Sequence, residues 1–235
     1  MSAARPSPAP RFEVGVRAEN HTAALRSRIY AELAAAFDYP SNESASARIA
    51  SGATERELRE LLAQLDWPLS ASLGAANAEA MRHRGTGDEA VDVLHCSLFD
   101  SATGASAVSL YERDYAEVGR EVLWEDLFRC YTHFGLEFDD GGLAEAPDLL
   151  TIELEFMHYL AFLEASNPES SRGSVLGQAD FLQRHLAAWT PRFCDALAAR
   201  AAESVYRWIA ALLREFIAAD RGYLESKAHE LRRHR

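Results

Sequence analysis

Apolar residues recur every three or four positions along most of this chain, an interval that matches the repeat of an α-helix. The spacing is clearest in the second half, where one apolar stripe begins at Leu123 and another at Val205. Only the stretch "GASAVSL", which ends at Leu110, leaves room for a short strand. We therefore predict an all-α protein, built as a single-domain helical bundle of about eight to ten helices.

Composition divides the chain into one folded region and two tails. Residues 1–20 contain three of the eight prolines and are predicted to be a disordered N-terminal tail. Residues 21–225 carry the helical spacing and are predicted to form the folded domain, followed by a polar C-terminal tail at 226–235. Inside the domain, the polar stretch after Leu163 is expected to be a loop, and Pro191 is expected to kink or break its helix.

The charge balance narrows the possible partners. The chain carries 24 basic and 36 acidic residues, which gives a net charge of −12. Nucleic acid and anionic membranes attract positive charge, so neither is an expected partner, whereas a basic ligand would suit this chain. No apolar segment reaches the length of a signal-peptide core or a membrane span, so we expect a cytoplasmic protein without membrane insertion.

Motifs for catalysis or metal binding are scarce. The chain has no glycine-rich phosphate loop and no zinc-protease or serine-hydrolase motif, and its three cysteines lie too far apart for a zinc site. Two carboxylate-x-x-histidine pairs suggest a di-iron site in a helical bundle, namely Glu155 with His158 and Asp92 with His95. The helical phase turns Glu155 and His158 toward solvent, which disfavours a metal-binding enzyme. We expect no catalytic residue, metal or cofactor.

One predicted helix carries a carboxylate inside its own apolar stripe. In "EAPDLLTIELEFMHYLAFL", Glu153 falls among the apolar residues that would face the core. Burying an unpaired carboxylate costs several kcal/mol, so the acid should have a partner. We predict that Glu153 is a structural buried acid that fixes how its helix docks, with Arg120, Tyr111 and Tyr115 as candidate partners.

Four segments between Leu110 and Phe193 carry a family resemblance: "LYERDY", "LWEDLFRCYTHFGL", "EAPDLLTIELEFMHYLAFL" and "DFLQRHLAAWTPRF". In this order they resemble the TorD/DmsD/NarJ family of redox-enzyme maturation chaperones. They are most similar to the chaperones of type II dimethyl-sulfoxide-reductase-family molybdenum enzymes. The resemblance implies an all-helical, cytoplasmic and non-catalytic chaperone. Its implied partners are an apo molybdopterin-containing large subunit and the twin-arginine signal peptide of that subunit.

The same resemblance indicates where the client would bind. The family signature of an acid, a proline, an aspartate and a histidine maps onto Glu145, Pro147, Asp148 and Leu149, so the histidine is replaced by leucine here. Asp148 would either cap its helix or contact the client. The expected client-binding surface combines acids with aromatic side chains: Asp148, Glu145, Asp139, Asp140, Tyr111, Tyr115 and Trp124.

Two further expectations complete the hypothesis. The chaperone would assist cofactor insertion into the large subunit and delay its export until maturation is complete. A monomer is expected, although exchange of helices between protomers could produce a dimer. The alternatives are a di-iron type of metal-binding enzyme and a generic helical adaptor that docks a partner helix in a groove.

Overall fold

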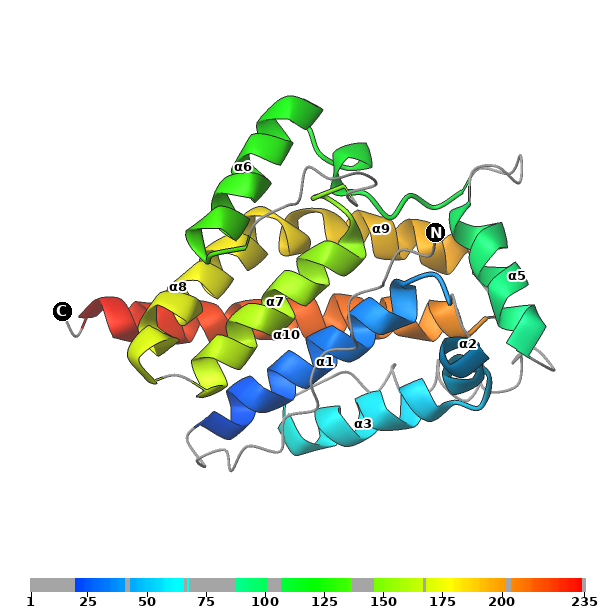
Figure 1. The fold of residues 1–235 in the computed structure, drawn as a ribbon, viewed down its shortest axis with the longest axis horizontal. Coiled ribbons are helices and arrows are strands. Elements are labelled where there is room, and N and C mark those ends of the chain that lie inside the picture. The colour runs from blue at the N-terminus through cyan, green and yellow to red at the C-terminus, as the bar shows by residue number, and fades with distance from the viewer. Residues whose placement is uncertain are drawn as a thin grey trace, which may run out of the picture.

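The computed structural model describes residues 20–40, 43–65, 67, 88–100, 107–136, 146–166, 168–201 and 204–233. These ranges form nine α-helices and one short 3-10 helix, η3 (Figure 1). The helices are α1 (His21–Phe37), α2 (Glu43–Ala50), α3 (Ala53–Leu65), α5 (Asp88–Phe99), α6 (Arg120–His133), α7 (Leu150–Ser166), α8 (Pro168–Arg184), α9 (Leu186–Arg200) and α10 (Val205–Arg233), with η3 at Glu112–Asp114. The described ranges contain no sheet, only an isolated antiparallel bridge between Tyr111 and Leu149. The predicted all-α, single-domain bundle is confirmed.

Helices α1 and α7 lie side by side at the centre of the bundle, with α10 behind them (Figure 1). Helix α8 packs against α7, α9 and α10, and α3 covers the other side of α1. The interior is rich in aromatic rings; Phe37, for example, meets Phe193 edge-on at 5.5 Å between ring centroids. Among the described helices, none combines the length and the apolar composition required to span a membrane.

A fully buried arginine ties the central helices together. The Arg26 guanidinium on α1 donates to Glu164 on α7 at 3.0 Å, to Gln178 on α8 at 2.6 Å and to both carboxylate oxygens of Asp220 on α10. Tyr30 donates to Asp220 as well. We call this set the Arg26 cluster: Arg26, Tyr30, Glu164, Gln178, Asp220 and Lys227, which pairs with Glu164.

Helix α6 lies at the edge of the bundle and is attached mainly by side chains. Its Tyr131 ring packs edge-on against Phe156 at 4.8 Å and also contacts Phe181. The helix ends in a Schellman motif, in which the Leu136 amide donates to the Tyr131 carbonyl. Gly135 supplies the positive φ of 78° that this turn needs.

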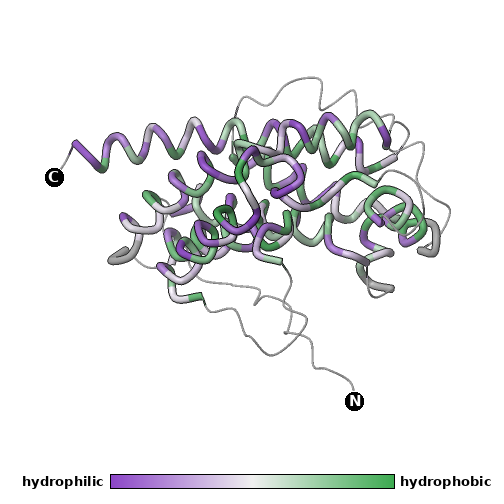
Figure 2. The backbone as a smooth tube through the Cα atoms, turned by 90° about the horizontal axis from the view of Figure 1, so that it is seen from above, coloured by the Kyte–Doolittle hydropathy of each residue, from purple (hydrophilic) through white to green (hydrophobic). Residues whose placement is uncertain are grey.

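In three places the structure contains more helix than the sequence analysis expects. The polar stretch after Leu163 forms the end of α7 and the first turns of α8 rather than a loop; Val175 is buried, and α8 packs against α7 and α10. Pro191 lies inside α9 without breaking it, since buried neighbours such as Trp189 and Phe193 hold the helix in place; a kink at this residue stays a prediction. Helix α10 runs through Arg233, so 226–233 is helical, and its C-terminal end extends past the bundle (Figure 2). The tail predicted at the N-terminus lies outside the described residues, except for Asn20.

Candidate functional site

The 107–119 segment, which connects α5 to α6, organises the candidate site. It pairs in antiparallel fashion with the start of α7: the Glu112 amide donates to the Asp148 carbonyl at 2.9 Å, and the Leu150 amide donates to the Leu110 carbonyl at 2.8 Å. The hydroxyl of Tyr131 on α6 donates to the Pro147 carbonyl at 2.8 Å. The segment is therefore held against α7, and α6 is fastened beside it.

The Asp148 side chain is fully buried where these elements meet. One carboxylate oxygen accepts from the Arg113 guanidinium at 2.7 Å and from the Trp124 indole at 2.9 Å; the other accepts from the Arg113 amide at 3.2 Å. The guanidinium lies 3.8 Å from the centre of the Tyr111 ring. Asp148 thus joins three elements through side chains instead of capping α7, and the client-binding role given to it remains a prediction.

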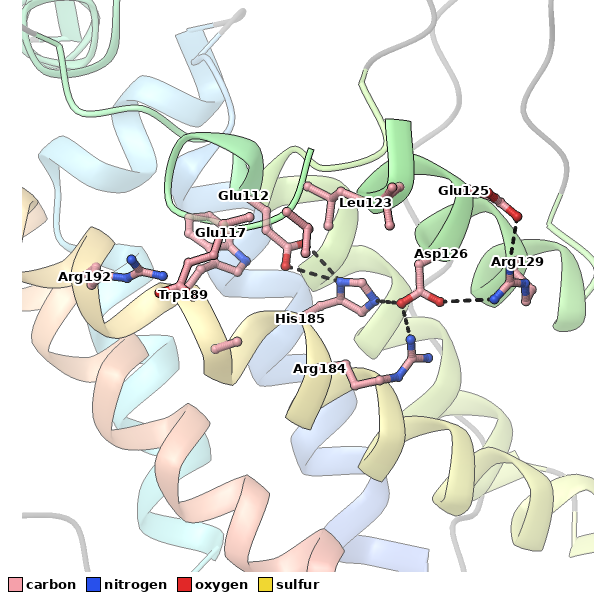
Figure 3. Close-up of a pocket in the computed structure, with 14 residues that line it drawn as sticks. Glu112, Glu117, Leu123, Glu125, Asp126, Arg129, Arg184, His185, Trp189 and Arg192 are labelled. Atoms are coloured by element: carbon pink, nitrogen blue, oxygen red, sulfur yellow. Dashed lines mark hydrogen bonds and ion pairs between the residues drawn. The ribbon is translucent and has the colours of Figure 1, made fainter. Parts of the chain in front are cut away.

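A buried acid–histidine pair lies on the other side of the 107–119 segment. His185, at the junction of α8 and α9, donates from Nδ1 to Glu112 at 3.0 Å, and its Nε2 lies 3.5 Å from Asp126 (Figure 3). Burial lowers the pKa of His185, but its contacts with Cys130 and Glu112 outweigh burial and raise the pKa to about 9. His185 is therefore protonated at neutral pH, while its Nε2 makes no hydrogen bond within the described part of the chain.

Glu153 is fully buried, as the sequence predicts, but its partner differs from the predicted ones. The indole of Trp189 on α9 donates to Glu153 Oε2 at 3.1 Å, whereas the candidate partner Arg120 is exposed and lies over Trp124. Burial, and next the negative charge of Glu112, raise the pKa of Glu153 well above its usual value. A protonated Glu153 has a hydroxyl with which it can donate to Glu112.

These residues form one connected network that is mostly buried. We call it the Glu112 cluster: Glu112, Arg113, Trp124, Asp148, Glu153, His185 and Trp189. Its three carboxyl groups are buried together, and only His185 is a fully buried base, because the Arg113 side chain is 27% exposed. The cluster is therefore rich in acid, which favours the protonated form of Glu153.

Two clefts share the 107–119 segment as a wall. Cleft 1 has a volume of about 530 Å³ and is lined by Glu112, by the end of the segment and by α6 and α9 (Figure 3). Cleft 2 has a volume of about 650 Å³ and is lined by Arg113, by the start of the segment and by α5. Adjacent residues of one segment therefore face different clefts.

The structure brings four of the predicted client-binding residues together and leaves three outside the described ranges. Tyr111 lines cleft 2. Tyr115 stacks on Trp189 at 5.4 Å between ring centroids, and the Trp124 indole is bonded to Asp148. The three residues outside the described ranges are Asp139, Asp140 and Glu145.

Sequence reasoning missed Glu112, His185 and Tyr39. Glu112 and His185 lie within the segments that carry the family resemblance, "LYERDY" and "DFLQRHL", but their pairing joins residues 73 positions apart. Tyr39 follows α1 and reaches cleft 2 from a distant part of the chain.

The two carboxylate-x-x-histidine pairs do not assemble into a site. Glu155 is exposed. The helical phase predicts that His158 faces solvent, but the side chain is half-buried. Helix α1 packs over it and places Ser27 Oγ 2.8 Å from its Nδ1. His95 is buried against the Phe37 carbonyl at 3.2 Å. Within the described ranges, no three potential metal ligands come together.

Comparison with known proteins places the chain in a family and finds three similar proteins. The family model described as nitrate reductase delta subunit matches residues 50–195, which include the whole Glu112 cluster. The selenate reductase assembly chaperone protein of Thauera selenatis is 32% identical, over 61% of this chain and 75% of its own length. The chlorate reductase assembly chaperone protein of Ideonella dechloratans is 33% identical, over 62% and 76%. The perchlorate reductase assembly chaperone protein of Dechloromonas aromatica (strain RCB) is 29% identical, over 88% and 91%. No solved structure matches the chain.

Proposed function

The chain belongs to the nitrate reductase delta subunit family, and we propose that it is the assembly chaperone of a molybdenum oxidoreductase. The observation that carries this proposal is the similarity to three assembly chaperones over 75%, 76% and 91% of their own lengths. Those relatives are named for assembling reductases and not for catalysis. The family resemblance read from the sequence is thereby confirmed.

In this role the protein acts in the cytoplasm on the catalytic subunit before the cofactor is inserted. It binds the apo subunit, keeps it competent to accept the cofactor, and delays export until maturation is complete. Part of the recognition is directed at the twin-arginine leader of the subunit. The net charge of −12 favours such a basic peptide at long range.

Cleft 2 has the chemistry to receive the leader. Its lining includes the aromatic side chains of Tyr39, Phe99 and Tyr111 and the carboxylates of Asp100 and Asp114, which together suit a guanidinium; Tyr111 already holds that of Arg113. Two nearby bases do not oppose this: Asp148 neutralises Arg113, and burial lowers the pKa of His95, which is therefore uncharged at neutral pH. The cleft is consequently acidic and aromatic, and Tyr111 belongs to the surface predicted from the sequence.

Affinity purification from the native host tests the function. The full-length tagged chain is recovered from cells that cannot synthesise the molybdenum cofactor, and the bound proteins are identified by mass spectrometry. We expect a large molybdopterin-type subunit in about equal amount, with its twin-arginine leader still attached. Recovery of the mature subunit only, or of no such subunit, would contradict the proposal.

Titration with a synthetic leader peptide tests the place of binding. Tyr39→Ala and Asp114→Asn should each weaken peptide binding, and Asp114→Asn should also reduce its salt dependence. Glu125→Gln is the matched control, because it removes the same charge from an exposed side chain of cleft 1. Equal effects of Glu125→Gln and Asp114→Asn would show that only the overall charge matters.

A further inference from the structure

Exposed apolar side chains gather at the clefts. The described residues expose four large apolar side chains to at least half of their full extent: Tyr39, Val93, Val118 and Val122. Tyr39 lines cleft 2, and the two valines of the 107–119 segment and α6, Val118 and Val122, line cleft 1. Apolar surface held at the rim of a cleft, with polar residues around it, is typical of an interaction site.

Cleft 1 differs from cleft 2 in its charge. Its four acids are balanced by four bases, since His185 is protonated, and most of the charges are already engaged in ion pairs. Asp126 pairs with Arg184, and Arg129 pairs with Glu125 at 2.9 Å. A cleft without net charge gives little attraction to paired arginines, so it suits a different segment of the client from the leader.

Two charges of cleft 1 remain for a partner. Glu117 and Arg192 are exposed on the 107–119 segment and on α9, and neither forms an ion pair within the described part of the chain (Figure 3). An acid and a base beside the exposed valines match a segment that carries apolar residues together with charges of both signs. An amphipathic helix has this composition.

The floor of cleft 1 is preformed and still has hydrogen-bonding capacity. Leu123 and Trp189 are buried there, and Trp189 is held by its bond to Glu153. The side chain of His185 is 2% exposed and lines the cleft, and its Nε2 has no hydrogen bond in the described ranges. Nε2 faces Asp126 at 3.5 Å, an ion-pair distance that leaves it without a hydrogen bond, so this nitrogen can still donate one to a bound chain.

We propose that cleft 1 is a second client-binding site, which takes an amphipathic helix of the apo catalytic subunit outside its leader. This inference rests on the proposed chaperone function. The apolar face of the helix packs on Val118 and Val122, a basic side chain of the helix meets Glu117, and an acidic one meets Arg192. A helix is the fitting element, because α6 and α9 supply most of the lining and the described residues offer no sheet edge that could pair with an added strand.

Paired valine substitutions test this site. Val122→Glu places a charge on the apolar rim of cleft 1, whereas Val93→Glu places one on α5 at a valine of nearly equal exposure, 63% against 62%. Co-purification first identifies the catalytic subunit. The probe is the apo form of that subunit, produced without its leader. We expect Val122→Glu to weaken its binding at least tenfold and Val93→Glu to leave it unchanged. The isolated leader peptide should bind both variants as it binds the wild type.

Val118→Asp serves as a second variant at the same rim and should reproduce the selective loss. Failure of the wild-type chaperone to bind the leaderless subunit would overturn the second site, while binding of the full-length subunit would leave the proposed function standing. If Val122→Glu weakened binding of the leader peptide as much as binding of the leaderless subunit, cleft 1 would be assigned to the leader instead. A wild-type dimer that Val122→Glu converts to a monomer, measured by light scattering, would assign the rim to self-association.

Discussion

The protein has two buried polar clusters, and they are built on opposite principles. In the Arg26 cluster, both carboxylates face a base: Asp220 pairs with Arg26, and Glu164 pairs with Arg26 and Lys227. Although burial raises the pKa of Glu164, the charges of Arg26 and Lys227 outweigh it and lower the pKa, so the acid stays ionised. The Glu112 cluster buries more acid than base, leaves one histidine nitrogen without a hydrogen bond in the described ranges and raises the pKa of Glu153 well above its usual value.

The positions of the clusters match this difference. The Arg26 cluster joins α1, α7, α8 and α10 at the centre of the bundle and lines neither of the two clefts described above. The Glu112 cluster lies beneath cleft 1 and reaches cleft 2 through Arg113. The Arg26 cluster, in which each carboxylate is paired with a base, holds the central helices together. The Glu112 cluster, which has more acids than bases, lies where a partner is proposed to bind. Incomplete pairing at a functional surface is a common compromise in proteins.

The largest expected effect belongs to the Arg26 cluster. Arg26→Met should lower the free energy of unfolding by about 3–5 kcal/mol, because it leaves Asp220 and Glu164 buried without their shared base. The control is Arg28→Met, two positions along α1, where an exposed pair with Glu57 contributes less than about 1 kcal/mol. Urea unfolding of both variants measures the difference. Equal losses would refute the structural role of the cluster.

The second-largest effect is expected in the pH dependence of the free energy of unfolding, to which the two clusters should contribute differently. The pKa of His185 is raised from 6.5 to about 9, so its stabilisation is complete below pH 6.5 and is lost as the pH rises through 9. The loss is up to about 3 kcal/mol. Arg26, Glu164 and Lys227 keep their charges across this window, because the pKa values of the two bases are raised and that of Glu164 is lowered. Urea unfolding at pH 6.5 and 9 should therefore show a decline in the wild type that is much smaller in Glu112→Gln; parallel profiles would disprove this assignment.

An intermediate effect is expected at Asp148. Asp148→Asn should cost about 2 kcal/mol, because the charge-assisted bonds from Arg113 are weakened at a buried position. The sequence alone predicts a capping loss near 1 kcal/mol. Asp114→Asn, an exposed acid of the same segment, should change thermal stability by less than about 0.5 kcal/mol. A similar small change in both variants would mean that Asp148 is not the link between the elements.

The smallest effect is expected at Glu153, and it depends on the replacement. Glu153→Gln should stay within about 0.5 kcal/mol of the wild type, because an amide has the shape and neutrality of the protonated acid and still accepts from Trp189. Glu153→Ala should cost about 1–3 kcal/mol, because it leaves the indole unpaired. Calorimetric melting of the two variants at pH 7 provides the measurement. A large loss in Glu153→Gln would show that the carboxyl group is ionised.

The sequence by itself determined the fold class and the burial of Glu153. Both depend on local spacing, since apolar residues three and four positions apart share a helical face whatever the rest of the chain does. The resemblance carried by the four segments also placed Tyr111, Tyr115, Trp124 and Asp148 in one region, and the structure brings them together.

Only the tertiary structure decided which charges meet. Arg26 and Asp220 are 194 positions apart, and the partner of Glu153 comes from another helix. In α8 a polar stretch is helical although its own spacing does not predict it, and the Phe134 ring packs directly against Gly177, where a Cβ atom would collide with it. Such contacts depend on how whole helices are rotated and docked. That arrangement is set by the packing of many distant side chains at once, which the periodicity of a single segment does not contain.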